Sequence, residues 1–170
     1  MNAPISTRLT GEHDVSQFDC GNEVLNKWLQ IKALSADKGM TSRTYVWLFD
    51  DDPTAVKAYY AIAPTSVNRA EDGLSSGAAG GMQSVPAFLL AKFALDSSIQ
   101  GRGYGTDLLI DAVSKIIGAA QVSGGRLIVV DAIDEAAFNF YKKYSFIPVQ
   151  KTPGRLVMKM TTALGAFGIG

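Results

Sequence analysis

The chain has 170 residues, of which 47% are hydrophobic and 19% charged, and its 16 basic and 16 acidic residues balance to a formal net charge of zero. This length suffices for one domain with its own core, and the charge balance excludes a uniformly basic nucleic-acid binder, so any RNA contact needs a local patch. No apolar run approaches the roughly 20 residues that span a bilayer. The single cysteine allows no internal disulfide, and the first residues lack a secretory signal, so we expect a cytoplasmic protein without a membrane segment.

The first third of the chain predicts a short strand, a helix and an antiparallel hairpin. Residues 5–9 have strand character, and a turn at 18–22 offers Asp19 or Asn22 as the cap of the following helix. That helix has one apolar stripe, which predicts burial against a core: Leu25, Trp28, Leu29 and Ala33. A polar link, 36–42, precedes strands at 44–49 and 55–63, and Pro64 is expected to end the second strand. The acids at 50–52 suit a solvated hairpin tip better than a metal site.

Residues 66–84 differ in composition from their surroundings. The run 75–81 consists of serine, glycine and alanine, which have little surface to bury and much backbone entropy to lose. We expect a flexible connection within a single domain, 1–170, because the preceding hairpin is too small to fold alone.

The second half predicts two buried parallel strands and their helices. Residues 88–95 and 127–132 are near-continuous apolar runs, typical of central strands that are joined by a crossover helix. Asp134 is placed to cap a helix over 135–143, and strands at 146–149 and 156–160 close the sheet. The tail, 161–170, is small and glycine-rich, so we expect it to be frayed. The order β, α, ββ, β-loop-α, β, α, ββ predicts a mixed α/β sheet.

A glycine-rich loop joins the first of these buried strands to its helix. Glycines let backbone N–H groups approach a ligand, and the first turn of a helix attracts anions, so this order of elements predicts a phosphate site. It lacks the Gly-Lys-Ser/Thr of a P-loop, and Thr106 stands where a dinucleotide fingerprint needs glycine. The loop reads Gln100, Gly101, Arg102, Gly103, Tyr104, Gly105 and Thr106.

The spacing Gln100-x-x-Gly103-x-Gly105 resembles the acyl-CoA loop of the GNAT (N-acetyltransferase) superfamily. A second motif of that superfamily, Asn-x-x-Ala-x-x-aromatic-Tyr-x-x-x-Gly-Phe, is similar to residues 134–146, with matches at Ala137, Phe140, Tyr141 and Phe146. Asp134 replaces its asparagine and Ser145 its glycine. The resemblance implies a GNAT fold, with a mixed sheet of about six or seven strands, about four flanking helices and two splayed central parallel strands.

A narrower resemblance covers most of residues 5–160. The run Phe18-Asp19-Cys20-Gly21 and the segments 85–86, 95–96 and 130–132 are similar to the GNAT toxins of toxin–antitoxin pairs. This likeness implies a toxin that acetylates the α-amino group of aminoacyl-tRNA and blocks translation. It also implies a ribbon-helix-helix antitoxin and a homodimer.

The resemblance assigns roles to particular residues. Acetyl-CoA would bind through its diphosphate to the loop 100–106, with a contact from Asp134, and through its pantetheine arm to the strand residues Phe93, Ala94 and Leu95. Tyr141 corresponds to the family's general acid, and no metal is implied. Basic residues around the site are candidates for tRNA phosphates, although an ordinary solvated surface charge is the default interpretation of each: Arg8, Lys38, Arg43, Lys142, Lys143 and Arg155.

Two other functions stay open at this point. The neutral net charge is compatible with an N-acetyltransferase that acts on a small amine or a protein N-terminus. A non-catalytic CoA-binding module is the third possibility, and the intact loop together with Tyr141 disfavours it. The residues offer no catalytic triad, because the only histidine is His13 and no histidine lies near Cys20 in sequence.

Overall fold

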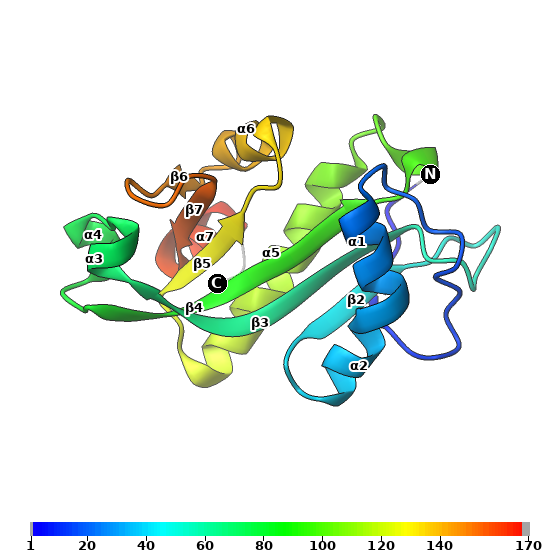
Figure 1. Ribbon diagram of the computed structural model, residues 1–170, viewed down its shortest axis with the longest axis horizontal. Helices are drawn as coiled ribbons and strands as arrows, with labels where there is room; N and C mark the ends of the chain where they lie inside the picture. Colours follow the sequence, from blue (N-terminus) through cyan, green and yellow to red (C-terminus); the bar gives the residue numbers. More distant parts are fainter. Residues whose placement is uncertain (1, 168–170) are drawn as a thin grey trace. The chain divides into compact units, whose positions relative to one another are not determined.

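The computed structural model describes residues 2–167 and contains a mixed seven-stranded sheet in the order β1-β2-β3-β4-β5-β7-β6 (Figure 1). The strands are β1 Thr7–Arg8, β2 Arg43–Trp47, β3 Ala58–Asn68, β4 Ser84–Leu95, β5 Leu127–Asp131, β6 Ile147–Pro148 and β7 Arg155–Lys159. The helices are α1 Glu23–Lys27, the π-helix η1 Trp28–Lys32, α2 Ala33–Lys38, α3 Arg69–Asp72, α4 Ser76–Ala79, the 3-10 helix η2 Ser97–Ile99, α5 Tyr104–Ser123, α6 Glu135–Lys143 and α7 Met160–Ala166. The mixed sheet is confirmed, while α3, α4 and α7 exceed the four or so helices expected.

The pairing of the strands agrees with the predicted topology. β4 and β5 are parallel, in a register that runs from Ala87 opposite Leu127 to Leu90 opposite Val130. The other described pairs are antiparallel: β1 with β2, β2 with β3, β5 with β7, and β6 with β7. By its internal contacts the chain divides into two compact units, Met1–Ala63 with Ala91–Ala112 and Pro64–Leu90 with Val113–Gly170. β3, β4 and α5 each contribute residues to both units.

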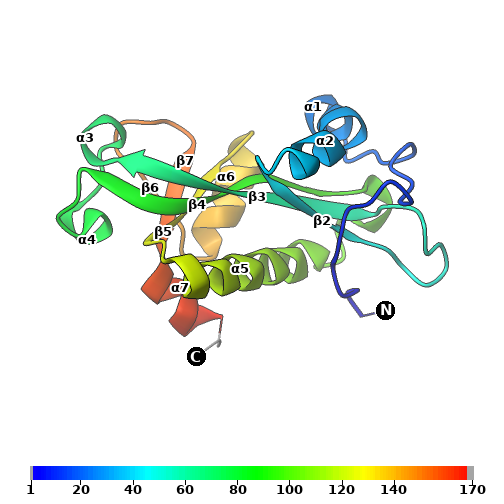
Figure 2. The same ribbon diagram turned by 90° about the horizontal axis from the view of Figure 1, so that it is seen from below.

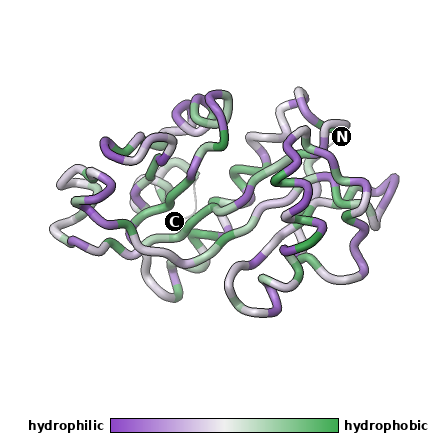
Figure 3. Tube along the Cα trace, in the orientation of Figure 1, coloured by the Kyte–Doolittle hydropathy of each residue, from purple (hydrophilic) through white to green (hydrophobic). Residues whose placement is uncertain are grey.

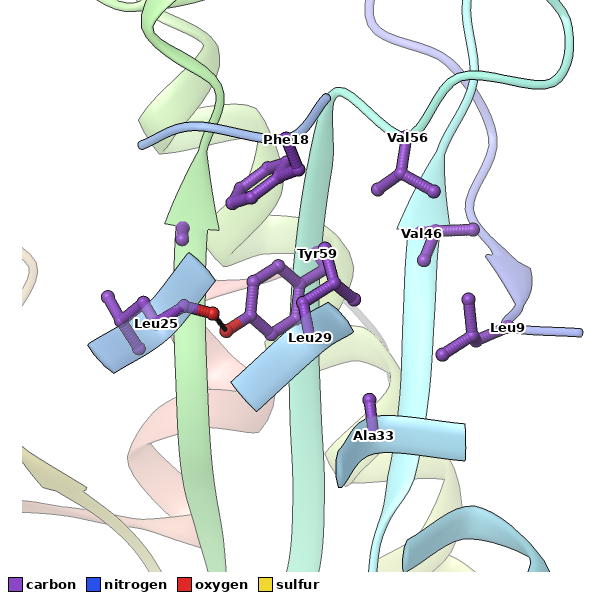
Figure 4. Packing of buried hydrophobic residues seen from close by; sticks show 9 residues of the cluster. Leu9, Phe18, Leu25, Leu29, Ala33, Val46, Val56 and Tyr59 are labelled. Atoms are coloured by element: carbon purple, nitrogen blue, oxygen red, sulfur yellow. Dashed lines mark hydrogen bonds between the residues drawn. The ribbon is translucent and has the colours of Figure 1, made fainter. Parts of the chain in front are cut away.

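In the first unit, one continuous helical segment, α1–η1–α2, covers a face of β2 and β3. The Asn22 side chain accepts a hydrogen bond from Leu25 N (3.1 Å) and so caps α1. Leu25, Leu29 and Ala33 are buried and belong to one hydrophobic cluster with Tyr59 (Figure 4). Trp28, expected in the same buried stripe, is only partly buried and stacks on Tyr59 with ring centroids 6.1 Å apart.

The opposite face of these strands is covered by the first half of α5 (Figure 2). Neighbouring residues of a strand point to opposite faces, so Tyr59 donates its hydroxyl to Leu25 O (2.7 Å) while Tyr60 donates its hydroxyl to Asp111 of α5. Asp111 also accepts from Ser6 Oγ (2.6 Å) and Trp47 Nε1 (3.3 Å). One carboxylate thus fixes α5 to the sheet and to the N-terminal segment.

The second unit is built on β4, β5 and β7, where hydrophobic residues gather along the strands (Figure 3). Four consecutive residues of β5, Leu127–Val130, are completely buried, as the uninterrupted apolar run predicted. At the exposed end of β5, Asp131 binds Arg155 of β7, whose Nε lies 2.8 Å away. The same arginine binds Asp72 of α3 through Nη1 (3.5 Å), so the two ion pairs join the ends of these strands to α3.

Two expectations for the second unit are wrong. β3 continues through Pro64, because Pro64 lies beyond the last pair with β2, Arg43 opposite Ile62, and its missing N–H removes no bond from that ladder. Residues 66–84, expected to form a flexible connection, instead complete β3, form α3 and α4, and begin β4. Asn68 and Ser75 cap the two helices. The Arg126 side chain donates to Ala78 O and Gly77 O, both at 2.9 Å.

The tail also differs from the expectation of fraying. Residues 160–166 form α7, in which Met160 and Ala163 are buried. The helix follows β7 without a gap, and Met160 N donates to Arg126 O (2.7 Å). The last three residues, 168–170, lie outside the described part of the chain.

Candidate acetyl-CoA loop and catalytic tyrosine

The predicted glycine-rich loop lies in the first unit, between the end of β4 and the start of α5. Gly101 and Gly103 have φ of +75° and +84°, a backbone conformation that favours glycine. Both residues are exposed, and a Cβ added at either would meet no atom within 4 Å. The loop backbone is therefore open to a ligand on the side where these glycines lie.

α5 follows directly and is anchored at its first residue. Tyr104 is buried, and its ring packs edge-on against Trp47 and Phe49, with centroids 6.1 and 5.7 Å away. Four N–H groups at the start of any helix lack an intrahelical partner, and the helix dipole is positive there. The anchored start of this 20-residue helix is suited to bind an anion.

Arg102 is exposed and lines a surface pocket of about 260 Å³ beside the loop. The pocket also contains Lys57, and the two cations are opposed by one acid, Asp51. The full lining is Phe49, Asp51, Lys57, Ser98, Ile99, Arg102 and Tyr104. The charged side chains of this pocket are therefore positive in sum, which favours a phosphate ligand over a neutral one.

The Gln100 side chain forms hydrogen bonds with backbone carbonyls outside the loop. Its amide donates to Leu95 O (2.8 Å) and to Cys20 O (3.0 Å), so the side chain closes the loop onto the end of β4 and onto the N-terminal turn. Of the three β4 residues expected at the pantetheine arm, Ala94 is buried, and Phe93 and Leu95 are partly buried. The Leu95 carbonyl is thus already engaged by Gln100.

Sequence reasoning did not assign a role to Asp96, which organises the segment before the loop. Its carboxylate accepts from Asp19 N (2.9 Å), Ser98 N (3.0 Å) and Ser98 Oγ (2.6 Å). Burial opposes ionisation of Asp96, but these hydrogen bonds outweigh burial and lower its pKa. The signal was present in the sequence as an Asp-Ser-Ser run, a common local cap.

The second unit holds the other two candidates, Asp134 and Tyr141. Asp134 caps α6, because its Oδ1 accepts from Ala137 N (2.8 Å). Tyr141 is buried at 6% exposure, and its ring packs edge-on against Phe146 with centroids 5.5 Å apart. Burial raises the pKa of the Tyr141 phenol, so the phenol stays protonated at physiological pH.

Three of the six basic candidates for tRNA contacts are engaged in ion pairs. Arg8 and Arg43 both bind the buried Asp37, and Arg155 binds Asp131 and Asp72. Lys38, Lys142 and Lys143 are exposed. Within residues 2–167, no helix is long and apolar enough to cross a membrane, and no group of three or more His, Cys, Asp or Glu could hold a metal ion.

No family model matches the chain. It is 32% identical over 161 residues to the tRNA-acetylating toxin of Mycobacterium tuberculosis, a match that covers 95% of each chain. The chain belongs to the family of GNAT tRNA-acetylating toxins. Two solved structures of the toxin AtaT, each 26% identical to the chain, share its fold.

One of these structures is AtaT complexed with acetyl-methionyl-tRNAfMet, with a TM-score of 0.85 over 95% of this chain and 98% of the other. The second is a Tyr-to-Phe mutant of AtaT bound to the C-terminus of the antitoxin AtaR and to acetyl-CoA, with a TM-score of 0.81 over 96% and 97%. The predicted resemblance to GNAT toxins, including their fold, is thereby confirmed for nearly the whole chain.

Proposed function

We propose that this protein is the toxin of a toxin–antitoxin system, which transfers the acetyl group of acetyl-CoA to the α-amino group of aminoacyl-tRNA. An acetylated amine cannot attack a peptidyl ester, so the product would block translation. The observation that carries this function is the 32% identity to a tRNA-acetylating toxin along 95% of both chains.

Acetyl-CoA fits the loop in the first unit as the donor. The diphosphate would bind backbone N–H groups of residues 101–106, where Gly101 and Gly103 leave the approach open. Arg102 and Lys57 would add positive charge. The pantetheine arm would run along the β4 residues Phe93, Ala94 and Leu95 in the manner of an added strand. Asp134, which caps α6, is proposed as a further contact.

The chemistry needs a proton donor more than a strong base. A free α-amino group has a pKa of about 7.7–8.0, and an ester-linked one is lower, so the amine is largely neutral at physiological pH. Its lone pair attacks the thioester carbon, and collapse of the tetrahedral oxyanion breaks the C–S bond. Tyr141 would protonate the leaving thiolate as general acid, because its phenol carries a proton at physiological pH. The amine proton leaves to solvent.

The proposed function implies three partners: an antitoxin, a second copy of this chain and the tRNA substrate. A similar toxin has been solved with the C-terminus of its antitoxin, and we propose an antitoxin for this chain as well, of the ribbon-helix-helix type. We further propose a homodimer that acts in the cytoplasm, where charged tRNA is found. Phosphates of the tRNA would meet the exposed Lys38, Lys142 and Lys143 rather than the paired arginines.

A panel of acceptors tests the function. Purified protein is incubated with radiolabelled acetyl-CoA and, in parallel, with charged tRNA, the same tRNA after deacylation, a small primary amine and a peptide with a free N-terminus. We expect label on charged tRNA alone. Label on the amine or the peptide, with none on any charged isoacceptor, would replace the toxin function with that of an ordinary N-acetyltransferase.

A further inference from the structure

The turn at residues 18–21 has no role in the proposed chemistry, yet its backbone is hydrogen-bonded at three points to Asp96, Ser97 and Gln100, that is, to the segment before the acetyl-CoA loop and to the first residue of the loop. Asp19 N donates to Asp96 Oδ1 (2.9 Å), and Asp19 O accepts from Ser97 N (2.8 Å). Cys20 O accepts from the Gln100 amide (3.0 Å). These bonds join segments about 80 residues apart in sequence.

One buried side chain of α1 holds this turn in shape. Asn26 is 5% exposed; its Oδ1 accepts from Cys20 N (2.8 Å), and its Nδ2 donates to Asp19 Oδ1 (3.0 Å). The orientation of the amide is fixed by its partners, because a backbone N–H can only donate and a carboxylate can only accept. The Asp19 carboxylate also accepts from Gly21 N (2.9 Å).

We propose that Asp19 and Asn26 are positioning residues for acetyl-CoA, and that with Asp96 and Gln100 they form a clasp that holds the loop in its ligand-binding conformation. The inference rests on the proposed acetyl transfer. Gly101 and Gly103 are exposed, and no atom lies within 4 Å of a Cβ added at either, so we infer that the conformation of residues 100–103 depends on the two ends of this segment. α5 fixes one end through Tyr104, and the clasp fixes the other.

The clasp acts on one part of the ligand. A loop that is not held in place must be ordered when the diphosphate binds, and that entropy reduces the affinity. The acetyl group and the pantetheine arm do not depend on this ordering, so a donor without the nucleotide should be unaffected. Acetyl-CoA and acetyl-pantetheine therefore separate a positioning role from general destabilisation.

The test replaces Asn26 by aspartate, and the matched control makes the same change at Asn22 on the same helix. Asn26→Asp keeps the acceptor for Cys20 N but sets a second carboxylate against that of Asp19. Asn22→Asp keeps the helix cap, because aspartate and asparagine cap equally well. We expect Asn26→Asp to raise the KM for acetyl-CoA about tenfold, as for loss of one charge-assisted hydrogen bond, with kcat little changed.

The same variant should leave the KM for acetyl-pantetheine within about twofold of wild type, and Asn22→Asp should leave both donors unchanged. The reciprocal double variant, Asp19→Asn with Asn26→Asp, restores a donor opposite an acceptor and should recover part of the lost affinity for acetyl-CoA. An equal loss for both donors, or no loss for either, would overturn the clasp. Wild-type protein that binds acetyl-CoA but acetylates no charged tRNA would instead overturn the proposed function. The same comparison of variants would then be made on the Kd for each donor, with the same expected fold-changes.

Discussion

Gly103→Ala tests whether the loop backbone binds acetyl-CoA, and the structure supplies a matched control in Gly81→Ala. Gly103 and Gly81 have nearly the same φ, +84° and +83°, both are exposed, and a Cβ at either would meet no atom within 4 Å. Each substitution therefore introduces the same backbone strain and no clash. We expect each to lower the free energy of unfolding by about 1 kcal/mol.

Only Gly103→Ala should affect the ligand. Relief of the strain at position 103 turns the neighbouring N–H groups away from the diphosphate, and one lost hydrogen bond to a charged group costs about 1.5–3 kcal/mol. This corresponds to an increase of roughly ten- to a hundredfold in the Kd for CoA. Isothermal titration calorimetry measures the Kd, and urea unfolding measures stability. If the two variants bind CoA equally well, the diphosphate does not use this loop.

The remaining predictions concern Tyr141 and Asp37. Tyr141→Phe removes the proposed proton donor, so kcat should fall roughly 10²–10⁴-fold, while the Kd for acetyl-CoA and the Tm stay close to wild type; an unchanged kcat would exclude this phenol as the acid. Asp37→Asn breaks the pairs with Arg8 and Arg43 and should cost about 2 kcal/mol in urea unfolding at pH 7. Burial opposes ionisation of Asp37, but hydrogen bonds from Arg8 and Thr44 N and the two arginine charges lower its pKa. Its contribution is therefore fully present above the unfolded-state pKa of about 3.9 and is lost as the pH falls through the lower folded-state pKa, so the stability gap between wild type and Asp37→Asn should narrow as the pH falls below that range. A constant gap between them would show that Asp37 is not stabilising through its charge.

Local signals in the sequence were enough to predict several helices and strands. The helix at 135–143 has the predicted bounds, because Asp134 caps it, Glu135 lies in its first turn and two lysines end it. The parallel pairing of β4 with β5 followed from two continuous apolar runs. The glycine-rich turn before α5 has the open backbone that the sequence predicted, because Gly101 and Gly103 have positive φ and no atom lies within 4 Å of an added Cβ.

Other features depend on partners that are distant in sequence, and the chain gives no local sign of them. The composition of residues 75–81 predicted a flexible segment. The structure has a short helix there, because Arg126, almost 50 residues away in sequence, donates hydrogen bonds to two carbonyls of α4. The sequence predicted a ligand contact for Gln100 but did not indicate that its amide also donates to the carbonyls of Cys20 and Leu95. Arg8 and Arg43 were candidates for tRNA contacts, and nothing in the sequence indicated that both form ion pairs with Asp37. That the two compact units act as one acetyltransferase domain, with Tyr141 at the thioester, stays a prediction.

Mass spectrometry of the acceptor would test the proposed reaction most directly. After incubation with acetyl-CoA and charged tRNA, nuclease digestion releases the terminal adenosine with its amino acid still attached. We predict one added acetyl group on the amino acid and none on the nucleoside, and a much smaller yield of this product in the same time when Tyr141→Phe replaces the wild-type protein. Acetyl on the nucleoside, or an unmodified aminoacyl-adenosine from every isoacceptor, would contradict acetyl transfer to the α-amino group.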